Sequence, residues 1–212
     1  MHSLSVAKQV ASYLLETEAI KIRPNQPFQW SSGWNSPIYC DNRVALSYPN
    51  IRAFIKEELA ELIKRSFGNA GCVAGVATAG IAQGALVADA LNLPFAYVRP
   101  EPKKHGMGNQ IEGRIEPGKK VVVVEDLIST GGSSLKAIEA LRQNGIEVIG
   151  LVAIFTYGFP QAEENFAAAG VKFATLSSYS ELLELAQERG TITAEQTNSL
   201  QEWRKAPEVW GK

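Results

Sequence analysis

Residues 121–134 read Val-Val-Val-Val-Glu-Asp-Leu-Ile-Ser-Thr-Gly-Gly-Ser-Ser, and a helical pattern begins at Leu135. A continuous run of β-branched residues is typical of a strand buried on both faces, as in the parallel sheet of an α/β protein. The two glycines after the run indicate a tight turn before the helix. This strand, turn and helix predict the central unit of an α/β fold.

The alternation of short apolar strands and helices continues on both sides of this stretch. Helical periodicity also marks residues 4–15 and the run from Ile51 to Ile63, for which Ser47 or Asn50 is the expected cap. The expected strands are 72–77, 95–98, 121–124, 148–155 and 171–176, with helices at 81–91 and 133–143. Such an alternation predicts one mostly parallel sheet flanked by helices.

Between the two N-terminal helices the pattern differs. Short apolar segments at 20–22, 28–30 and 37–40 are separated by prolines and indicate a small antiparallel unit outside the main sheet. No internal repeat and no long linker interrupts the chain, so residues 1–212 are expected to form a single domain.

Composition excludes several classes of protein. The 212 residues are 45% hydrophobic and 20% charged, as in ordinary globular proteins, and no run approaches the length of a membrane span. With 21 basic and 22 acidic residues, no global field favours nucleic acid or acidic lipid. Two cysteines, Cys40 and Cys72, are too few for a disulfide framework. We therefore expect a cytoplasmic protein without nucleic-acid or membrane partners, which binds any anion through local groups.

The residues after the valine run carry the chemistry. Ligands of open α/β sheets bind beyond the carboxyl ends of the strands, where Glu125 and Asp126 are expected to accept hydrogen bonds from a ribose diol. The Thr130-Gly131-Gly132-Ser133 turn offers hydroxyls and free N–H groups at a helix N-terminus, which suits a phosphate. A Gly-Gly turn alone is as often purely structural. Together, however, the acids and the turn predict a ribose 5-phosphate site. The nucleotide motifs of P-loop and dinucleotide-binding proteins are missing.

This stretch resembles the 5-phosphoribosyl 1-pyrophosphate (PRPP) motif of the type I phosphoribosyltransferases. With residues 28–43, reading Phe-Gln-Trp-Ser-Ser-Gly-Trp-Asn-Ser-Pro-Ile-Tyr-Cys-Asp-Asn-Arg, and residues 99–113, reading Arg-Pro-Glu-Pro-Lys-Lys-His-Gly-Met-Gly-Asn-Gln-Ile-Glu-Gly, the chain is similar to the orotate phosphoribosyltransferase family. The resemblance covers most of the chain, from the first helix to about Tyr157, and weakens over the C-terminal fifty or so residues. It implies the type I phosphoribosyltransferase fold, with a small N-terminal hood over approximately residues 18–43 and a mobile lid over approximately 99–113.

The resemblance also implies the site. Lys103 is the catalytic candidate, because its cation can stabilise charge on the departing pyrophosphate. The expected orotate contacts are Ser129, Tyr39, Cys40 and Arg43. The expected PRPP contacts are Arg99, Lys103, His105, Glu125, Asp126, Leu127, Ile128, Ser129, Thr130, Gly131, Gly132 and Ser133. Mg²⁺ is implied as a cofactor held mainly through PRPP and water, without a protein metal site. A homodimer is implied as well, with each lid acting across the interface.

The chain departs from the enterobacterial branch of that family at four positions. Ser31, Ala79, Pro100 and Tyr157 stand where that branch carries cations, so the orotate contacts are expected to be redistributed, with Arg43 as a candidate replacement. The implied reaction joins orotate to the phosphoribosyl group of PRPP and gives orotidine 5′-monophosphate and pyrophosphate, a step of pyrimidine biosynthesis. Two alternatives remain: a phosphoribosyltransferase for another base, and a PRPP-sensing regulator that binds nucleic acid.

Overall fold

The computed structural model describes residues 4–30, 33–102 and 109–210. Its main sheet has six strands in the order β10-β9-β8-β5-β6-β7. Neighbouring strands are parallel except β7, which pairs antiparallel with β6. The strands are β5 (Cys72–Val76), β6 (Phe95–Val98), β7 (Ile111–Glu112), β8 (Lys120–Ile128), β9 (Glu147–Thr156) and β10 (Phe173–Ser178). The predicted α/β fold with a mostly parallel sheet is confirmed.

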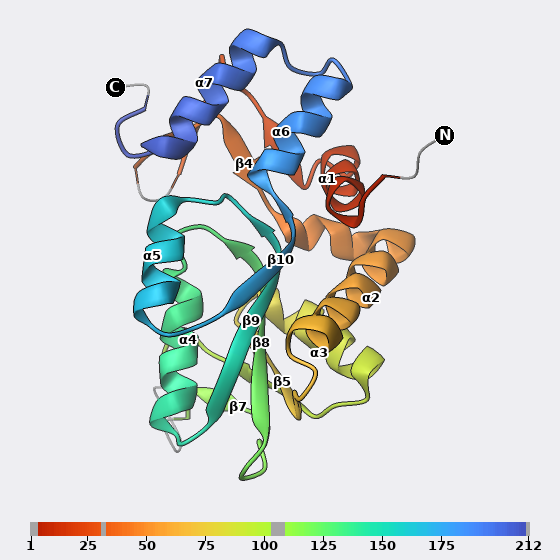
Figure 1. Cartoon of the computed structure of the whole chain (residues 1–212), viewed down its shortest axis with the longest axis vertical. Coiled ribbons are helices and arrows are strands. Elements are labelled where there is room, and N and C mark those ends of the chain that lie inside the picture. Colours follow the sequence, from red (N-terminus) through yellow and green to blue (C-terminus); the bar gives the residue numbers. More distant parts are fainter. Residues whose placement is uncertain (1–3, 31–32, 103–108, 211–212) are drawn as a thin grey trace.

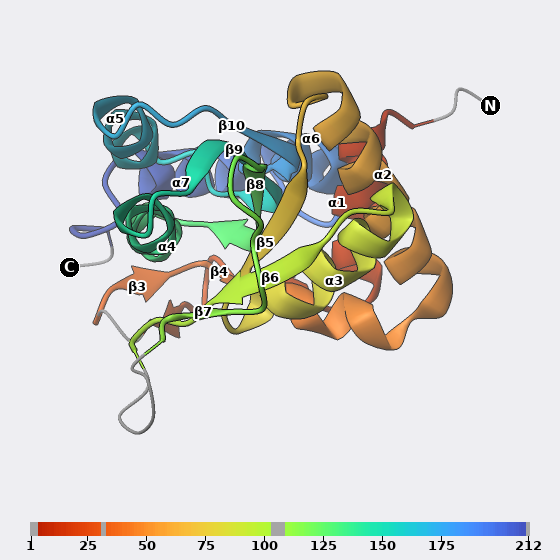
Figure 2. The ribbon, with the colours of Figure 1, turned by 90° about the horizontal axis from the view of Figure 1, so that it is seen from below.

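Helices cover both faces of this sheet (Figure 1). One face carries α4 (Gly132–Gln143) and α5 (Pro160–Ala168), and the other carries α1 (Val6–Glu16), α2 (Pro49–Ser66) and α3 (Ala79–Leu91), as the view along the sheet in Figure 2 makes clear. The valine run lies between these layers. Val122 and Val124 belong to one apolar cluster and Val121 and Val123 to the other, and all four are fully buried. The prediction of a strand covered on both faces is therefore confirmed.

Several predicted boundaries need correction. Neither Ser47 nor Asn50 caps α2, because Ser47 ends a 3₁₀ helix, η1 (Asn42–Ser47), and Tyr48 is the N-cap, followed by Pro49 at the first helical position. Proline suits that position, since its φ is already helical and it has no N–H to leave unpaired. The last strand begins at Phe173 and not at Val171, and the strand at the valine run continues to Ile128.

The N-terminal hood consists of two antiparallel pairs outside the main sheet. β1 (Ile20–Ile22) pairs with β4 (Ile38–Cys40), and β2 (Phe28–Gln29) pairs with β3 (Asn35–Ser36). The C-terminal helix α7 (Ala194–Lys205) packs against this unit: its Trp203 is fully buried and donates a hydrogen bond from Nε1 to the Asn35 carbonyl, at 3.2 Å. The N-terminal strands of the hood and the C-terminal helix α7 thus pack together, although they lie at opposite ends of the sequence.

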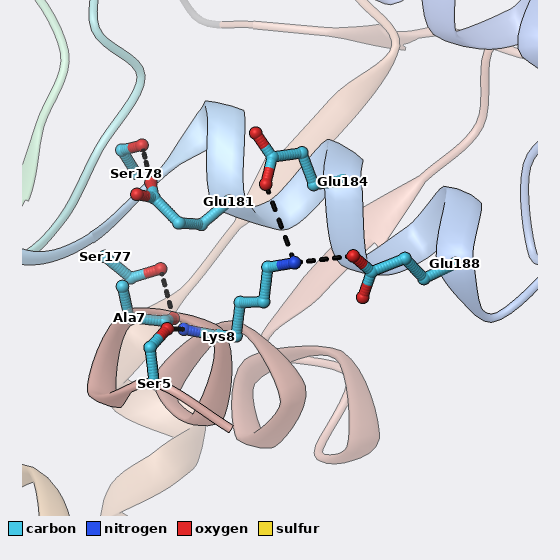
Figure 3. Close-up of polar contacts among 8 residues, drawn as sticks. All are labelled: Ser5, Ala7, Lys8, Ser177, Ser178, Glu181, Glu184 and Glu188. Carbon is cyan, nitrogen blue, oxygen red and sulfur yellow. Dashed lines mark hydrogen bonds and ion pairs between the residues drawn. The ribbon is translucent and has the colours of Figure 1, made fainter. Parts of the chain in front are cut away.

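The helix α6 (Tyr179–Glu188), which precedes α7 in the chain, packs against α1 (Figure 3). Lys8 Nζ lies 2.5 Å from Glu188 Oε1 and 3.6 Å from Glu184 Oε2, and the Ser177 hydroxyl donates to the Ala7 carbonyl at 2.8 Å. Because both glutamates are more than half exposed, the ion pairs contribute little, and the apolar packing beneath them holds the helices together.

No helix in the part of the chain that the structure describes combines the length and the apolar character that a membrane span requires.

Candidate active site

Two adjoining cavities open at the carboxyl ends of the central strands. The smaller, of about 360 Å³, lies between the β5–α3 turn and the segment from β8 to α4, and the larger, of about 730 Å³, lies under the hood. Leu127, Ser129 and Thr130 line both cavities. The smaller cavity is lined by Ala77, Thr78, Ala79, Glu125, Asp126, Leu127, Ser129, Thr130, Gly131, Gly132 and Ser133. All residues of the predicted ribose-phosphate segment except Ile128 thus meet around one space.

The turn before α4 has the geometry of an anion site. Gly131 is the N-cap of α4 with φ +81°, a conformation that favours glycine. A Cβ at Gly131 would lie 2.6 Å from Cε2 of Phe166 on α5, so both conformation and space require a glycine there. The first N–H groups of a helix have no partner within the helix, and they carry its positive dipole end. The predicted turn therefore presents donors to an anion in the smaller cavity.

The two acids differ in their surroundings. Glu125 is 4% exposed, and its carboxyl group accepts hydrogen bonds from the Asp126 N–H at 3.0 Å and from the Ser134 hydroxyl at 3.1 Å. Burial, and then the adjacent Asp126, raise the pKa of Glu125 to about 9. Burial also raises the pKa of Asp126. At neutral pH Glu125 therefore retains its proton, which reduces the negative charge that an anionic ligand meets.

The position of these acids on the strand differs from the expectation. Both were expected just beyond the strand end, whereas β8 continues through them to Ile128. Both acids line the smaller cavity, but Asp126 is partly exposed whereas Glu125 is buried. The side chain of Ile128, an expected PRPP contact, is fully buried in the core, and its carbonyl accepts from the Tyr157 N–H.

Four aromatic residues contribute to the walls of the larger cavity. Its walls are Gln29, Trp30, Trp34, Tyr39, Cys40, Leu127, Ser129, Thr130, Tyr157 and Gln161. The ring of Trp30 lies 5.2 Å from that of Tyr157 and 5.6 Å from that of Trp203, measured between centroids. Among the described residues, the lining includes no lysine or arginine. Flat aromatic walls with a few amide and hydroxyl groups suit a planar, polar ring.

Three of the predicted orotate contacts, Ser129, Tyr39 and Cys40, line this cavity. The Cys40 thiol donates to Asn42 Oδ1 at 3.2 Å, and burial raises its pKa well above the usual value, so it is a thiol and not a thiolate. Arg43 does not line the cavity; its guanidinium forms a two-pronged ion pair with Asp41, at 2.7 and 2.9 Å.

Sequence reasoning missed Gln29 and Gln161. Gln161 lies in the first turn of α5, just after β9. The rule that ligands bind beyond strand carboxyl ends, applied to β9 as well as β8, could have found it. Gln29 sits on a two-residue hood strand, and no local signal distinguishes it.

The predicted lid is only partly described. Its two arms form an antiparallel ladder in which Tyr97 pairs with Glu112 and Val98 with Ile111. Arg99 continues this ladder, since its N–H donates to the Gln110 carbonyl, and its guanidinium lies 3.4 Å from Glu112 Oε1. The expected loop of 99–113 thus ends in ordered β structure. Lys103 and His105 lie outside the described residues.

Comparisons with known proteins agree with this geometry. Residues 46–174 match the phosphoribosyl transferase domain family. The chain is 58% identical over 207 residues to the orotate phosphoribosyltransferase of Porphyromonas gingivalis, covering 98% of this chain and 99% of that relative. It is 54% identical over 209 residues to the orotate phosphoribosyltransferase of Listeria monocytogenes, covering 99% of this chain and all of that relative.

Among solved structures, the crystal structure of orotate phosphoribosyltransferase from Aeropyrum pernix is similar with a TM-score of 0.75 and 32% sequence identity, covering 87% of this chain and 99% of that one. The similarity to the bacterial relatives spans nearly the whole sequence. The resemblance therefore continues over the C-terminal fifty or so residues, where the sequence motifs alone were weaker.

Proposed function

The chain belongs to the phosphoribosyltransferase family and, within it, to the orotate phosphoribosyltransferases, and from that premise we infer its reaction. It transfers the 5-phosphoribosyl group of PRPP to orotate and forms orotidine 5′-monophosphate and pyrophosphate. This is a transferase reaction of pyrimidine biosynthesis.

One observation in the structure carries this conclusion: the two cavities share the wall formed by Leu127, Ser129 and Thr130. The smaller cavity combines acids with a helix N-terminus, which suits the diol and the 5-phosphate of the sugar. The larger cavity suits a planar base. A phosphoribosyl group in the first therefore directs C1 of its ribose toward a ring in the second, which is the arrangement that bond formation between them requires.

The chemistry needs position and electrostatics more than a nucleophile. A ring nitrogen of orotate forms a bond to C1 and gives up its proton to the pyrophosphate or to water. The bond from C1 to the pyrophosphate oxygen breaks at the same time, and its electron pair leaves with pyrophosphate. Positive charge develops at the sugar, and the Asp126 carboxylate lies at the cavity that holds it. The α4 N-terminus holds the 5-phosphate, and the aromatic walls under the hood orient the base.

Mg²⁺ fits the donors at this site. Asp126, Thr130 and Ser133 line the smaller cavity, and side-chain oxygen atoms are hard ligands of the kind that Mg²⁺ prefers. When bound with PRPP, the ion would neutralise charge on the pyrophosphate. Asp126 is the residue of this chain that would approach it or the ribose hydroxyls. Within the described residues, no group of three or more His, Cys, Asp or Glu side chains could hold a metal ion.

Several finer properties remain predictions drawn from the family resemblance. They are a homodimer with each lid acting across the interface, PRPP contacts from Arg99 and His105, charge stabilisation by Lys103, and a cytoplasmic location. An orotate contact from Arg43 is also a prediction, and its test is Arg43→Ala: unchanged orotate affinity would mean that its ion pair with Asp41 is only structural.

An assay of base consumption tests the proposed function. The protein is incubated with PRPP and Mg²⁺ and, in separate reactions, orotate, uracil, adenine or hypoxanthine, and both nucleotide and pyrophosphate are measured. We expect orotate to be the only one of these bases that is consumed. Its reaction should form orotidine 5′-monophosphate and pyrophosphate in equal amounts. Preferential use of a purine would identify a different phosphoribosyltransferase. Absence of turnover with salt-sensitive binding of nucleic acid would identify a regulator.

A further inference from the structure

The main chain of the substrate-binding segment is held at both ends by asparagine side chains. Nδ2 of Asn42 donates a hydrogen bond to the Asp126 carbonyl at 2.7 Å, across 84 positions of sequence. Nδ2 of Asn165 donates to the Thr130 carbonyl at 2.9 Å, across 35 positions. The first asparagine comes from η1 beside the hood and the second from α5. Two elements that are separate in the fold thus hold the same short segment.

Asn42 connects the two cavities. It is 1% exposed, and its Oδ1 accepts from the Cys40 thiol while its Nδ2 holds the Asp126 carbonyl. Cys40 lines the aromatic cavity, and Asp126 lines the ribose-phosphate cavity. Glu125 Oε1 accepts from the Asp126 N–H, so the peptide groups on both sides of Asp126 are fixed. The direction of the Asp126 carboxylate therefore depends on Asn42.

Asn165 supports the phosphate end of the segment together with its neighbour Phe166. Phe166 is 1% exposed, and its ring closes the space beside Gly131. The hydrogen bond from Asn165 fixes the peptide that joins Thr130 to Gly131, immediately before the first turn of α4. The orientation of the N–H groups that would receive the phosphate therefore depends on α5.

We propose that Asn42 and Asn165 are positioning residues, which fix the main chain of residues 126–130 in the geometry that binds PRPP, and that Asn42 also couples this segment to the base cavity. This inference rests on the proposed function. Neither side chain lines either cavity, so both act through the atoms that they hold. Preorganised groups at an active site gain their effect from such supporting contacts, and small displacements of them reduce turnover strongly.

The chain offers a control for the loss of one asparagine bond to the main chain. Asn144, at the C-terminal end of α4, also donates from Nδ2 to a main-chain carbonyl, that of Ala140 at 2.8 Å, but it lies outside both cavities. Asn42→Ala, Asn165→Ala and Asn144→Ala therefore each remove one asparagine bond to the main chain. Asn42→Leu and Asn165→Leu form a second set for the case that an alanine variant fails to fold, because leucine nearly keeps the side-chain volume and removes the hydrogen bonds without adding a charge.

The measurements are thermal stability and the KM values for PRPP and orotate. Loss of one positioning hydrogen bond is expected to raise the KM for PRPP about 10-fold in both Asn42→Ala and Asn165→Ala, against less than about 2-fold in Asn144→Ala. Asn42→Ala is also expected to raise the KM for orotate, because it releases Cys40. A merely structural role would lower the stability of all three variants and leave the KM values unchanged.

The outcomes separate this inference from the proposed function. If the unmodified protein shows no turnover of orotate, the proposed function fails before any variant is compared. If the unmodified protein is active and the Asn42 and Asn165 variants match Asn144→Ala in both KM values, only the positioning roles are refuted. An unchanged KM for orotate in Asn42→Ala, beside a raised KM for PRPP, refutes the coupling between the cavities.

Discussion

Replacing Glu125 with glutamine is expected to make the stability of the unliganded protein less dependent on pH. The pKa of this carboxyl group rises from 4.5 to about 9 on folding. The folded protein therefore binds a proton that the unfolded chain releases, so the free energy of unfolding falls as pH rises between these two values. Below pH 4.5 both states carry the proton, and this contribution to stability is fully present.

The magnitude follows from the pKa shift. Between pH 5 and pH 8, a group with this shift loses about 1.4 kcal/mol for each pH unit, or about 4 kcal/mol in all, as an upper bound. Because Glu125 and Asp126 titrate together, Asp126 carries part of this change. We expect Glu125→Gln to gain about 2 kcal/mol relative to the unmodified protein over that range. Glutamine keeps the shape of the side chain, and its amide can still bond to Ser134.

Urea denaturation at a series of pH values from 5 to 8 measures this difference. Glu163→Gln is the control, because it makes the same substitution at an exposed acid on α5. A difference for Glu125→Gln that is constant over the range, or a variant that becomes relatively less stable at pH 8, would show that Glu125 does not take up a proton on folding.

Three further variants test the site. Gly131→Ala is expected to lose about 1–3 kcal/mol of stability and most of its PRPP affinity, because its Cβ would meet the Phe166 ring at 2.6 Å. Gly118→Ala is the control, because Gly118 has a similar φ but open space around it. This control should keep its PRPP affinity in calorimetric titration. Trp203→Ala is expected to lower the free energy of unfolding by about 3–5 kcal/mol in denaturation experiments and to raise the KM for orotate. An unchanged KM would mean that α7 does not influence the base cavity. Lys103→Ala is expected to lower kcat by at least about 10²-fold, and unchanged turnover would remove its catalytic assignment.

The parts of the fold that were predicted correctly are those with a local signal. Val121 to Ser133 combine strand, turn and helix chemistry in one continuous segment, so pattern and propensity lead to the same structure. The turn could also be interpreted chemically, because glycine at a positive φ and hydroxyls at a helix N-terminus are properties of the residues themselves.

The features that were missed depend on contacts between distant parts of the chain. Trp203 donates to Asn35 across 168 positions, and Asn42 to Asp126 across 84. Neither residue has a periodic or spacing signal that would pair it with its partner. The sequence also gives no signal for the pairing of Ile111–Glu112 with β6, because a two-residue strand is too short to show alternation. The continuation of β8 from Glu125 to Ile128 likewise depends on pairing with the neighbouring strand β9.

A crystal structure with orotidine 5′-monophosphate tests the assignment of the two cavities, because this product should fill both. We expect the 5′-phosphate on the N–H groups of Gly131 to Ser133, the ribose hydroxyls at Asp126, and the pyrimidine ring between the hood and Tyr157. A nucleotide bound elsewhere, or one with its phosphate under the hood and its base at the start of α4, would contradict this assignment.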